Sequence, residues 1–383
     1  MVSPGKQQPS RKVLVLAPSL EVTGGIQRHT KTLIRALREL LGEKAVHALT
    51  LEPKRRKSKR GKGKAAPGST SGIGAGAKAL FICRALWGTI AWRPDLVIAA
   101  HVGFAPLAWL LGALSRCRYW VFAHGIEVWG ALTRSKRSAL VRSTRIIAVS
   151  DFTRRRLVER QLVSEDRALI LPNAAENPPS PQTDLRASLL AGQGRRVVLT
   201  VSRLASAERY KGHDVLLQAL VYVRHKVPDV LYLVVGEGDD RVRLEEQAQQ
   251  LNLGNSVRFL GEVSDEMLAA CYDLCEVFAM PSRTELNGSV PKGEGFGIVY
   301  LEAMMRGKPV IGPNYGAPTE FIRHGEHGLL VNPEDPEAVA AALVELLDSP
   351  QRARRMGEAA REWVMGEYSY LRFVERLGTL LRE

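Results

Sequence analysis

Residues 292–304 read Lys-Gly-Glu-Gly-Phe-Gly-Ile-Val-Tyr-Leu-Glu-Ala-Met, a glycine-rich loop followed by an apolar run. The apolar residues recur at helical spacing and predict a helix that begins near Gly297. Glycines let a ligand approach the backbone closely, and the unpaired N–H groups of a helix start bind phosphate. Glu294 precedes this start and Glu302 follows it by just over one turn, so one carboxylate is available at each end of a sugar–phosphate–nucleoside ligand. The alternative is an ordinary turn before a core helix, with two solvated glutamates.

Further short motifs surround this stretch in a defined order. They are Pro281-Ser282-Arg283, Gly307-Lys308-Pro309-Val310-Ile311-Gly312 and Gly316-Ala317-Pro318-Thr319-Glu320. Together with the two glutamates they resemble the retaining nucleotide-sugar glycosyltransferases of family 4, the group 1 enzymes that include glycogen synthase and mannosyltransferase types. The resemblance covers roughly residues 12–375. It implies the GT-B fold, an α/β architecture of two facing Rossmann-like, doubly wound domains with a cleft between them.

Composition is that of a globular protein long enough for two domains. The chain has 383 residues, of which 45% are hydrophobic and 25% charged. The four cysteines include no Cys-x-x-Cys pair, and the spacing of Cys271 and Cys275 is more typical of buried free thiols than of a metal site. This cysteine usage fits a reducing cytoplasm, and the N-terminus lacks the plan of a signal peptide.

One uncharged segment is nominally long enough to span a bilayer. Residues 96–114 contain no charged side chain over nineteen positions. They include His101, Gly103 and Pro106, however, and residues 96–100 have the pattern of a buried strand. We therefore predict a strand and a short apolar helix from about Phe104, both in a buried core, rather than a membrane span.

The positive charge is concentrated in the first half of the chain. Residues 1–180 hold 31 Lys and Arg against 11 Asp and Glu, whereas the remainder holds 23 against 29. Eight of the eleven residues 54–64 are basic, and the Gly-, Ser- and Ala-rich run that follows cannot bury a core. We predict a disordered surface loop here. Its charge is either simply solvated or attracts an anionic surface, namely nucleic acid or the cytoplasmic leaflet of a membrane.

The first half of the chain predicts a doubly wound α/β domain. A buried strand at 13–17, a glycine loop and a helix over 25–41 form the typical opening of such a fold. Gly24 and Gly25 let the backbone approach a phosphate or the acceptor, or else form a plain tight turn. Further strands are predicted at 119–123, 145–150 and 168–173.

His124 and Glu127 directly follow a predicted strand, at the end where open α/β sheets bind ligands. A lone histidine is more often structural than functional. The resembling family, however, has a histidine at the matching point beside the reacting sugar. The resemblance therefore implies that His124 hydrogen-bonds the donor sugar, and Glu127 is a weaker candidate for orienting the acceptor or the loop.

The second half predicts another doubly wound domain. Its strands are expected at 197–202, 231–235, 257–263, 277–280 and 328–331, with helices over 214–225 and from about 336 onward. Arg203 and Lys211 follow the first of these strands, where two cations can neutralise a departing diphosphate. On their own they would be surface cations, and the match to the family is what favours the diphosphate.

The resemblance implies a role for each candidate residue. Glu294, His124, Arg203 and Lys211 are the candidate catalytic residues. The nucleotide and phosphates are expected at Gly25, Arg203, Lys211, Gly261, Val263, Gly297, Ile298, Val299 and Glu302. The donor sugar and acceptor are expected at Gly24, His124, Glu127, Glu294, Gly295 and Phe296.

The domain boundaries follow from these assignments. We predict a disordered tail at 1–10, an acceptor-binding domain over 11–178 with a basic loop at 52–79, a proline-rich linker at 179–192, a nucleotide-sugar-binding domain over 193–360, and a final helix over 361–383 that crosses back to the first domain.

The predicted function is hexose transfer, with retention, from a nucleotide diphosphate sugar to a lipid-linked or polysaccharide hydroxyl. GDP-mannose is slightly favoured over a UDP-hexose. No carboxylate is obviously placed as a covalent nucleophile, so same-face displacement is implied by the resemblance alone. No Asp-x-Asp motif is present at an expected metal position, and Asp239 and Asp240 are interpreted as a solvated turn. We therefore expect no cofactor and no metal requirement.

Two other kinds of protein compete with this interpretation. One is a basic nucleic-acid- or membrane-binding protein without transferase activity, and the other is an epimerase or phosphorylase on the same fold. Aromatic residues make up only 6% of the chain and none lies in the basic run 54–64, which disfavours nucleic acid as a partner. We expect a cytoplasmic protein held peripherally at the inner face of the cytoplasmic membrane.

Overall fold

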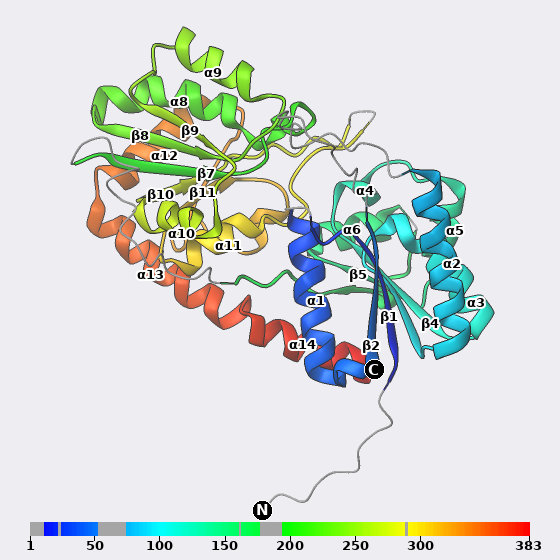
Figure 1. Cartoon of the computed structure of the whole chain (residues 1–383). Coiled ribbons are helices and arrows are strands. Elements are labelled where there is room, and N and C mark those ends of the chain that lie inside the picture. Colours follow the sequence, from blue (N-terminus) through cyan, green and yellow to red (C-terminus); the bar gives the residue numbers. More distant parts are fainter. Residues whose placement is uncertain (1–10, 22–23, 53–73, 161, 177–193, 288–289) are drawn as a thin grey trace, which may run out of the picture. The chain divides into compact units, whose positions relative to one another are not determined.

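The computed structural model describes residues 11–21, 24–52, 74–160, 162–176, 194–287 and 290–383. The tail 1–10, the basic run 54–64 and the linker 179–192 predicted from the sequence lie outside these residues. The described chain divides into two compact units (Figure 1). Unit 1 comprises the described residues up to Ala174 together with Tyr370–Glu383, and unit 2 comprises those from Ala175 to Ser369.

Unit 1 is built on a six-stranded parallel sheet with the order β2-β1-β3-β4-β5-β6. Its inner strands are continuous apolar runs because helices cover both faces of the sheet. The strands are β1 Val13–Pro18, β2 Val46–Leu51, β3 Leu96–Ala99, β4 Arg118–Ala123, β5 Arg145–Ala148 and β6 Ala168–Ile170.

The helices of unit 1 form two groups. Helices α1 and α14 pack against each other on one face of the sheet, and α2, α3 and α5 lie side by side on the other (Figure 1). The bounds are α1 Gly25–Leu41, α2 Ala75–Trp92, α3 Ala105–Ser115, α4 Ile126–Trp129, α5 Arg134–Val141, α6 Asp151–Glu159 and α14 Tyr370–Arg382. Helix α2 begins inside the range 52–79 that was predicted as a loop, so that boundary is wrong.

Unit 2 contains a second six-stranded parallel sheet, with the order β12-β11-β10-β7-β8-β9. Its strands are β7 Arg196–Val201, β8 Val230–Val235, β9 Val257–Gly261, β10 Val277–Ala279, β11 Val310–Pro313 and β12 Gly328–Val331. Its helices are α8 His213–Lys226, α9 Arg241–Gln250, α10 Asp265–Leu274, α11 Ile298–Met305, α12 Pro336–Leu347 and α13 Pro350–Glu367.

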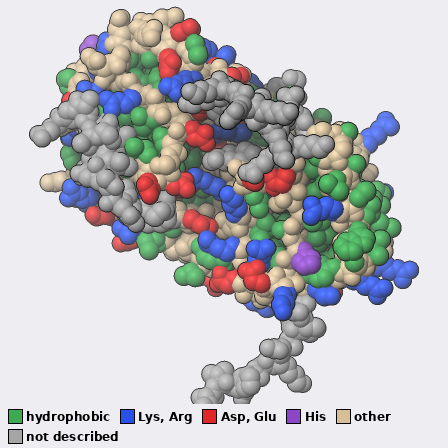
Figure 2. Space-filling model, viewed as in Figure 1, with side chains coloured by type: hydrophobic (Ala, Val, Ile, Leu, Met, Phe, Trp, Pro, Cys, Tyr) green, Lys and Arg blue, Asp and Glu red, His purple; other side chains and the backbone are tan. Residues whose placement is uncertain are grey.

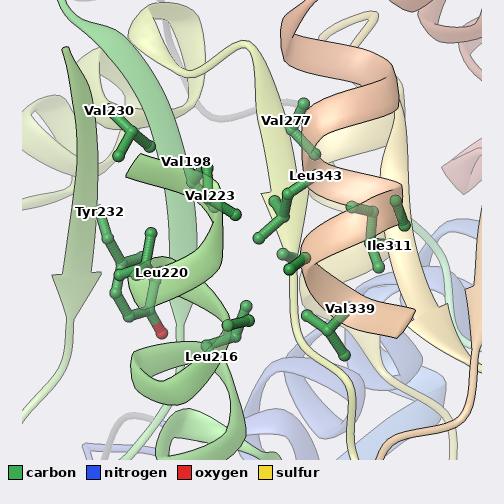
Figure 3. Packing of buried hydrophobic residues seen from close by; sticks show 14 of the residues in the cluster. Val198, Leu216, Leu220, Val223, Val230, Tyr232, Val277, Ile311, Val339 and Leu343 are labelled. Carbon is green, nitrogen blue, oxygen red and sulfur yellow. The ribbon is translucent and has the colours of Figure 1, made fainter. Parts of the chain in front are cut away.

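The core of unit 2 lies between the sheet and the helix pair α8 and α12. Figure 3 shows Leu216 and Leu220 of α8 and Leu343 of α12 pointing toward side chains of the strands. Tyr232 of β8 is fully buried in this core, and its hydroxyl donates a hydrogen bond to Thr200 Oγ1 at 2.9 Å. Close packing in this core therefore holds in place the strands whose following loops contain the predicted site residues.

Each sheet has one point where the strand order reverses. It lies between β1 and β3 in unit 1 and between β7 and β10 in unit 2. In open α/β sheets, ligands bind outside the carboxyl ends of the strands at such a switch point. The doubly wound fold predicted from the sequence is confirmed in both units, and the two switch points are where functional residues are to be sought.

The uncharged segment 96–114 folds as β3 and most of α3, as predicted, and none of the helices that the structure describes is long and apolar enough to cross a membrane. Helix α11 begins at Ile298, in agreement with the predicted start near Gly297. Residues 300–304 of this helix are all buried, because α13 and strand β11 both pack against it.

Candidate functional site

An ion pair joins the two loops that meet at the switch point of unit 2. Lys211 ends the 3₁₀ turn Ser206–Lys211 after β7, and Glu294 lies in the loop between β10 and α11. Lys211 Nζ donates to Glu294 Oε1 at 2.6 Å, and each side chain is only 13% exposed. The structure thus brings together two of the residues predicted to be catalytic. A charge this far from water needs a partner, and here each residue supplies it for the other.

Gly212 explains why Lys211 can reach this position. Its φ is +82°, and a Cβ atom on it would lie 2.3 Å from the carbonyl oxygen of Pro281, which follows β10. Only glycine combines this conformation with so close an approach of two backbones. The Lys-Gly pair therefore fixes the loop after β7 against the loop after β10.

Glu208 extends the ion pair into a four-residue charge network of Arg203, Glu208, Lys211 and Glu294. The Glu208 carboxylate pairs with the Arg203 guanidinium, and its other oxygen lies 3.9 Å from Lys211 Nζ. Arg203 is 67% exposed, whereas Glu208 is 14% exposed. Sequence reasoning missed Glu208, because an acidic residue inside a short turn carries no pattern that distinguishes it from a solvated one.

The start of α11 has the features predicted for a phosphate seat. Gly297 precedes the helix with φ of +100°, and no side chain caps the helix N-terminus. A Cβ atom on Gly297 would lie 2.7 Å from the Tyr300 ring, so the position requires glycine. Ile298 and Val299, the first helical residues, are half-buried. Their backbone N–H groups lie at the N-terminus of the helix, which is the positive end of the helix dipole.

Glu302 is held by a tyrosine from the neighbouring helix. Its side chain is 4% exposed, and its Oε2 accepts a hydrogen bond from the Tyr272 hydroxyl of α10 at 2.8 Å. Tyr272 was not predicted, because an aromatic residue between two buried cysteines gives no reason to expect a polar contact. The thiols of Cys271 and Cys275 are free and buried as predicted, and burial raises the pKa of each to about 12.

Gly295 and Phe296 occupy the loop between Glu294 and Gly297. The Phe296 side chain is 4% exposed and packs on Phe321 with ring centroids 5.2 Å apart. Because this ring belongs to the interior, Phe296 can offer a sugar only its backbone. For Phe296, the predicted contact with the sugar is therefore restricted to its main-chain atoms.

Backbone contacts join the carboxyl ends of β7, β8 and β9 beside Gly261 and Val263, two of the residues predicted to bind the nucleotide. The Gly236 N–H donates to the Gly261 carbonyl at 2.9 Å. A Cβ atom on Gly236 would lie 1.7 Å from the Ser202 carbonyl oxygen, so β8 passes close to the end of β7. Gly261 has φ of +70°, and Val263 follows it in the half-buried turn after β9.

The interpretation of Asp239 and Asp240 as a solvated turn is correct for Asp239, which is exposed, and wrong for Asp240. Asp240 is 4% exposed, and its carboxylate binds Arg209 at 2.8 Å and Arg243 at 2.5 Å. These hydrogen bonds and charges hold the pKa of Asp240 below its usual value, although burial opposes them. Asp239 accepts hydrogen bonds from the backbone and hydroxyl of Ser206, so both aspartates fix the turn that carries Lys211.

A buried polar network around His213 lies next to Lys211, one member of the charge network. His213 Nε2 lies 2.7 Å from Ser202 Oγ, and His213 Nδ1 lies 3.2 Å from the Tyr232 hydroxyl. Burial lowers the pKa of His213 to about 4, so the imidazole is neutral at physiological pH. Because it ties α8 to β7 and β8, this network fixes the elements on either side of Lys211.

The functional candidates of unit 1 gather at the ends of β3 and β4. His124 follows β4, its Nε2 lies 2.8 Å from the Ala100 carbonyl, and its backbone N–H donates to Glu127 Oε1 at 2.5 Å. Glu127 therefore orients the loop, one of the two roles considered for it. The His124 ring lies 5.0 Å from the buried His29 ring and 6.3 Å from His101, neither of which was predicted.

The protonation of two of these histidines is set by burial. Burial lowers the pKa of His29, and the electrostatic influence of the neighbouring His124 lowers it further. Burial is also the main cause that lowers the pKa of His101.

The predicted glycine pair of unit 1 lies at the start of α1. Gly24, in the loop after β1, is the N-cap residue of α1, and Gly25 is the first residue of the helix. The unit 1 candidates thus flank the β1/β3 switch point.

The positions of the His, Cys, Asp and Glu side chains do not decide whether the protein requires a metal ion. Within the described part of the chain, no group of three or more His, Cys, Asp or Glu side chains is placed to hold a metal ion. Metal independence stays a prediction, which activity in the presence of a chelator would check.

Two family models match the sequence. Glycosyltransferase Family 4 matches residues 23–176 and Glycosyl transferases group 1 matches residues 181–363. A GDP-mannose-dependent alpha-(1-6)-phosphatidylinositol monomannoside mannosyltransferase of Mycolicibacterium smegmatis is 34% identical over 76% of this chain and 80% of its own. A GDP-mannose-dependent monoacylated alpha-(1-6)-phosphatidylinositol monomannoside mannosyltransferase of Corynebacterium glutamicum is 31% identical over 73% of this chain and 74% of its own.

Solved structures of low sequence identity share the fold. Anabaena HepE in complex with UDP has a TM-score of 0.74 at 20% identity, over 97% of this chain and 99% of that chain. Sucrose-phosphate synthase from Thermosynechococcus elongatus has a TM-score of 0.74 at 23% identity, over 97% and 98%. These comparisons support the transferase prediction and give no support to a basic binding protein, an epimerase or a phosphorylase. The chain therefore belongs to the group 1 glycosyltransferases of family 4, and it is a hexosyltransferase with the GT-B fold that the sequence predicted.

Proposed function

We propose that the enzyme transfers mannose from GDP-mannose, with retention of the anomeric configuration, to a hydroxyl group of a lipid-linked acceptor. The observation that carries this proposal is the Lys211–Glu294 ion pair at the switch point of unit 2. It places a cation suited to a diphosphate next to a carboxylate suited to sugar hydroxyls. The names of the mannosyltransferase relatives support the choice of donor and of a lipid-linked acceptor.

The leaving diphosphate is the group that most needs stabilisation. As the bond from the sugar C1 to the phosphate oxygen breaks, negative charge grows on the diphosphate. Arg203, Lys211 and the N-terminus of α11 are the groups that would bind this charge. A new bond forms from C1 to the acceptor oxygen on the same face of the sugar. The departing phosphate oxygen takes the acceptor proton, so atoms and charges balance.

The two glutamates would act on different parts of the donor. Glu294 would accept hydrogen bonds from the sugar hydroxyls, and its contact with Lys211 keeps it beside the phosphates. Glu302 would bind the ribose hydroxyls, in an orientation that Tyr272 sets. A carboxylate held in place by a second residue loses less conformational freedom when the ligand binds.

His124 would contribute a hydrogen bond rather than a nucleophile. Its Nε2 faces the Ala100 carbonyl, which can only accept, so Nε2 carries a proton. In the neutral ring Nδ1 is then an acceptor for a sugar hydroxyl. Glu127 supports this role by holding the His124 backbone.

The membrane surface completes the proposal. A lipid-linked acceptor brings the enzyme to a bilayer, and the excess of basic residues in the first 180 positions suits the anionic inner leaflet. We place the enzyme in the cytoplasm, peripherally at the inner face of the cytoplasmic membrane. Nucleic acid is not a proposed partner.

A binding and transfer experiment tests the donor and the site together. Purified enzyme is heated with GDP, UDP, ADP and their common sugars, and transfer of labelled sugar to a lipid extract is measured. We expect stabilisation by GDP and GDP-mannose and the appearance of labelled lipid, with both lost in Glu302→Ala. Stabilisation by UDP alone would contradict the donor. Folded enzyme that responds to none of these nucleotides would contradict the proposed site.

A further inference from the structure

Large apolar side chains project from the outer side of α2 and α3 in unit 1. They are Leu80, Trp87 and Ile90 of α2 and Trp109, Leu110 and Leu114 of α3, which we call the apolar face. Trp87 is 74% exposed, Ile90 67% and Leu80 60%. Two tryptophans and four aliphatic residues on adjacent helices exceed the scattered apolar residues normal for a soluble surface.

The apolar face is exposed although the helices that carry it pack closely on their other sides. Phe81, Ala85 and Thr89 recur at intervals of four on the opposite side of α2, and all three are buried. Helix α2 packs beside α3, and α3 packs beside α5. The inner side of α2 therefore already fills the core, and the outer side is free to bind a partner.

The charged side chains of the helices that form and border the apolar face have a single sign. Helices α2, α3 and α5 contain no Asp or Glu, and Lys78 and Arg84 lie on α2 itself. Just beyond α5, the Arg142 guanidinium lies over the Trp109 ring at 5.6 Å from its centroid. Figure 2 shows hydrophobic side chains gathered where Figure 1 places α2, α3 and α5, with Lys and Arg among them.

This combination selects one kind of partner. A second copy of the chain would bring like-charged side chains against one another, and nucleic acid would bind the cations but leave the apolar side chains unused. An anionic lipid surface uses both, because tryptophans and aliphatic residues enter the headgroup region while Lys and Arg meet lipid phosphates. We infer that the apolar face is the surface through which unit 1 docks on an anionic bilayer.

This inference rests on the proposed lipid-linked acceptor for its choice of partner, yet it can fail independently. The test is sedimentation of the full chain with vesicles of phosphatidylcholine, with and without phosphatidylglycerol. The surface variant carries Trp87→Ser and Ile90→Ser. Its matched control carries Tyr222→Ser and Val242→Ser, two apolar residues of unit 2 that are 47% and 63% exposed.

We expect wild type and control to bind vesicles that contain phosphatidylglycerol. The surface variant should bind them at least about tenfold more weakly, because its apolar anchors are gone. Donor-induced thermal stabilisation checks that the variant is folded. Its transfer to a water-soluble, deacylated acceptor should match wild type, which separates docking from catalysis.

Three outcomes would overturn the inference. The first is wild type that fails to sediment with anionic vesicles, and the second is a surface variant that binds as well as the control, which would assign binding to another part of the chain. In the third, analytical ultracentrifugation would find a dimer that the surface variant dissociates, and the apolar face would then be a contact between copies. Loss of transfer with vesicle binding intact would instead count against the proposed reaction.

Discussion

Lys211 lies near two carboxylates, and this placement decides how the proposed donor site should respond to substitution. Glu294 contacts its ammonium group at 2.6 Å, and Glu208 lies 3.9 Å from the same group. In the proposed reaction, an incoming diphosphate would compete with these carboxylates for the same cation. The alternating charges of Arg203, Glu208, Lys211 and Glu294 would keep two cations in position before the donor arrives, which is the arrangement that electrostatic stabilisation of a leaving group requires.

The first prediction concerns Glu294. Glu294→Gln keeps the shape of the side chain but removes its charge, so it should lower kcat/KM by about 100-fold or more. Glu208 still neutralises Lys211, and Tm should therefore fall by only a few degrees. The control is Lys292→Gln in the same loop, which removes an exposed ion pair with Glu285 and should leave activity unchanged. Equal activity of the two variants would exclude a catalytic role for Glu294.

The second prediction concerns the buried His213. Its folded pKa of about 4 lies below the unfolded value of about 6.5, so the unfolded chain binds the proton more tightly. The stability that this provides is complete above pH 6.5 and is lost as pH falls toward 4, with a loss of about 2 kcal/mol by pH 5. Tm of wild type should fall more between pH 7 and pH 5 than Tm of His213→Gln. In His225→Gln, an exposed position of the same helix, the fall should equal that of wild type.

At the scale of the element, the loops after β7 and β10 act as one unit because glycine lets their backbones touch. Gly212→Ala would bring a Cβ atom to 2.3 Å from the Pro281 carbonyl oxygen, at a φ that suits only glycine. We expect this variant to lose about 1–3 kcal/mol of stability and to bind the donor more weakly, because Lys211 is displaced. Thermal unfolding and donor titration measure both effects. A normal donor affinity in a destabilised variant would show that the loop only supports the fold.

Gly254→Ala provides the matched control for the loop prediction. No atom lies within 4 Å of the Cβ position at Gly254, and this glycine also belongs to unit 2. The substitution should leave stability and donor affinity close to wild type. A similar loss in both variants would mean that the effect does not come from the contact with Pro281.

The elements differ in how well the sequence predicts them, and burial is the reason. Strands covered on both faces appear as continuous apolar runs, so β1, β4 and β8 were found close to their observed bounds. Helix α2 was missed because it is apolar on its outer side as well as its inner side, which removes the helical period.

The site was predictable only in part, for a related reason. Arg203, Lys211 and Glu294 were recognised from the spacing of family motifs, and that spacing says nothing about their partners. Glu208 and Tyr272 are identified by contacts across a turn and between helices, which only the fold creates. Asp240 was misassigned because adjacent acidic residues usually indicate solvent, whereas two arginines neutralise it here.

At the scale of the whole molecule, unit 1 is completed by the last residues of the chain. Helix α14 packs on α1, and its Phe373, Leu377 and Leu381 are buried in the core of unit 1. The Tyr370 hydroxyl donates to Glu39 at 2.8 Å, and the Arg35 guanidinium lies 3.6 Å from the centre of the Tyr370 ring. The first domain therefore cannot reach its full stability until the last helix of the chain has been made.

This dependence gives the last prediction. Leu377 is fully buried against α1, and Leu377→Ala should cost about 2–5 kcal/mol by removing apolar contacts and leaving a cavity. Leu371, on the same helix, is 75% exposed, so Leu371→Ala should leave the free energy of unfolding nearly unchanged. Hydrogen exchange should report the Leu377→Ala loss in β1, α1 and the other elements of unit 1, while the strands of unit 2 keep their protection. If both variants were equally stable, α14 would be an accessory helix and the core of unit 1 would be complete without it.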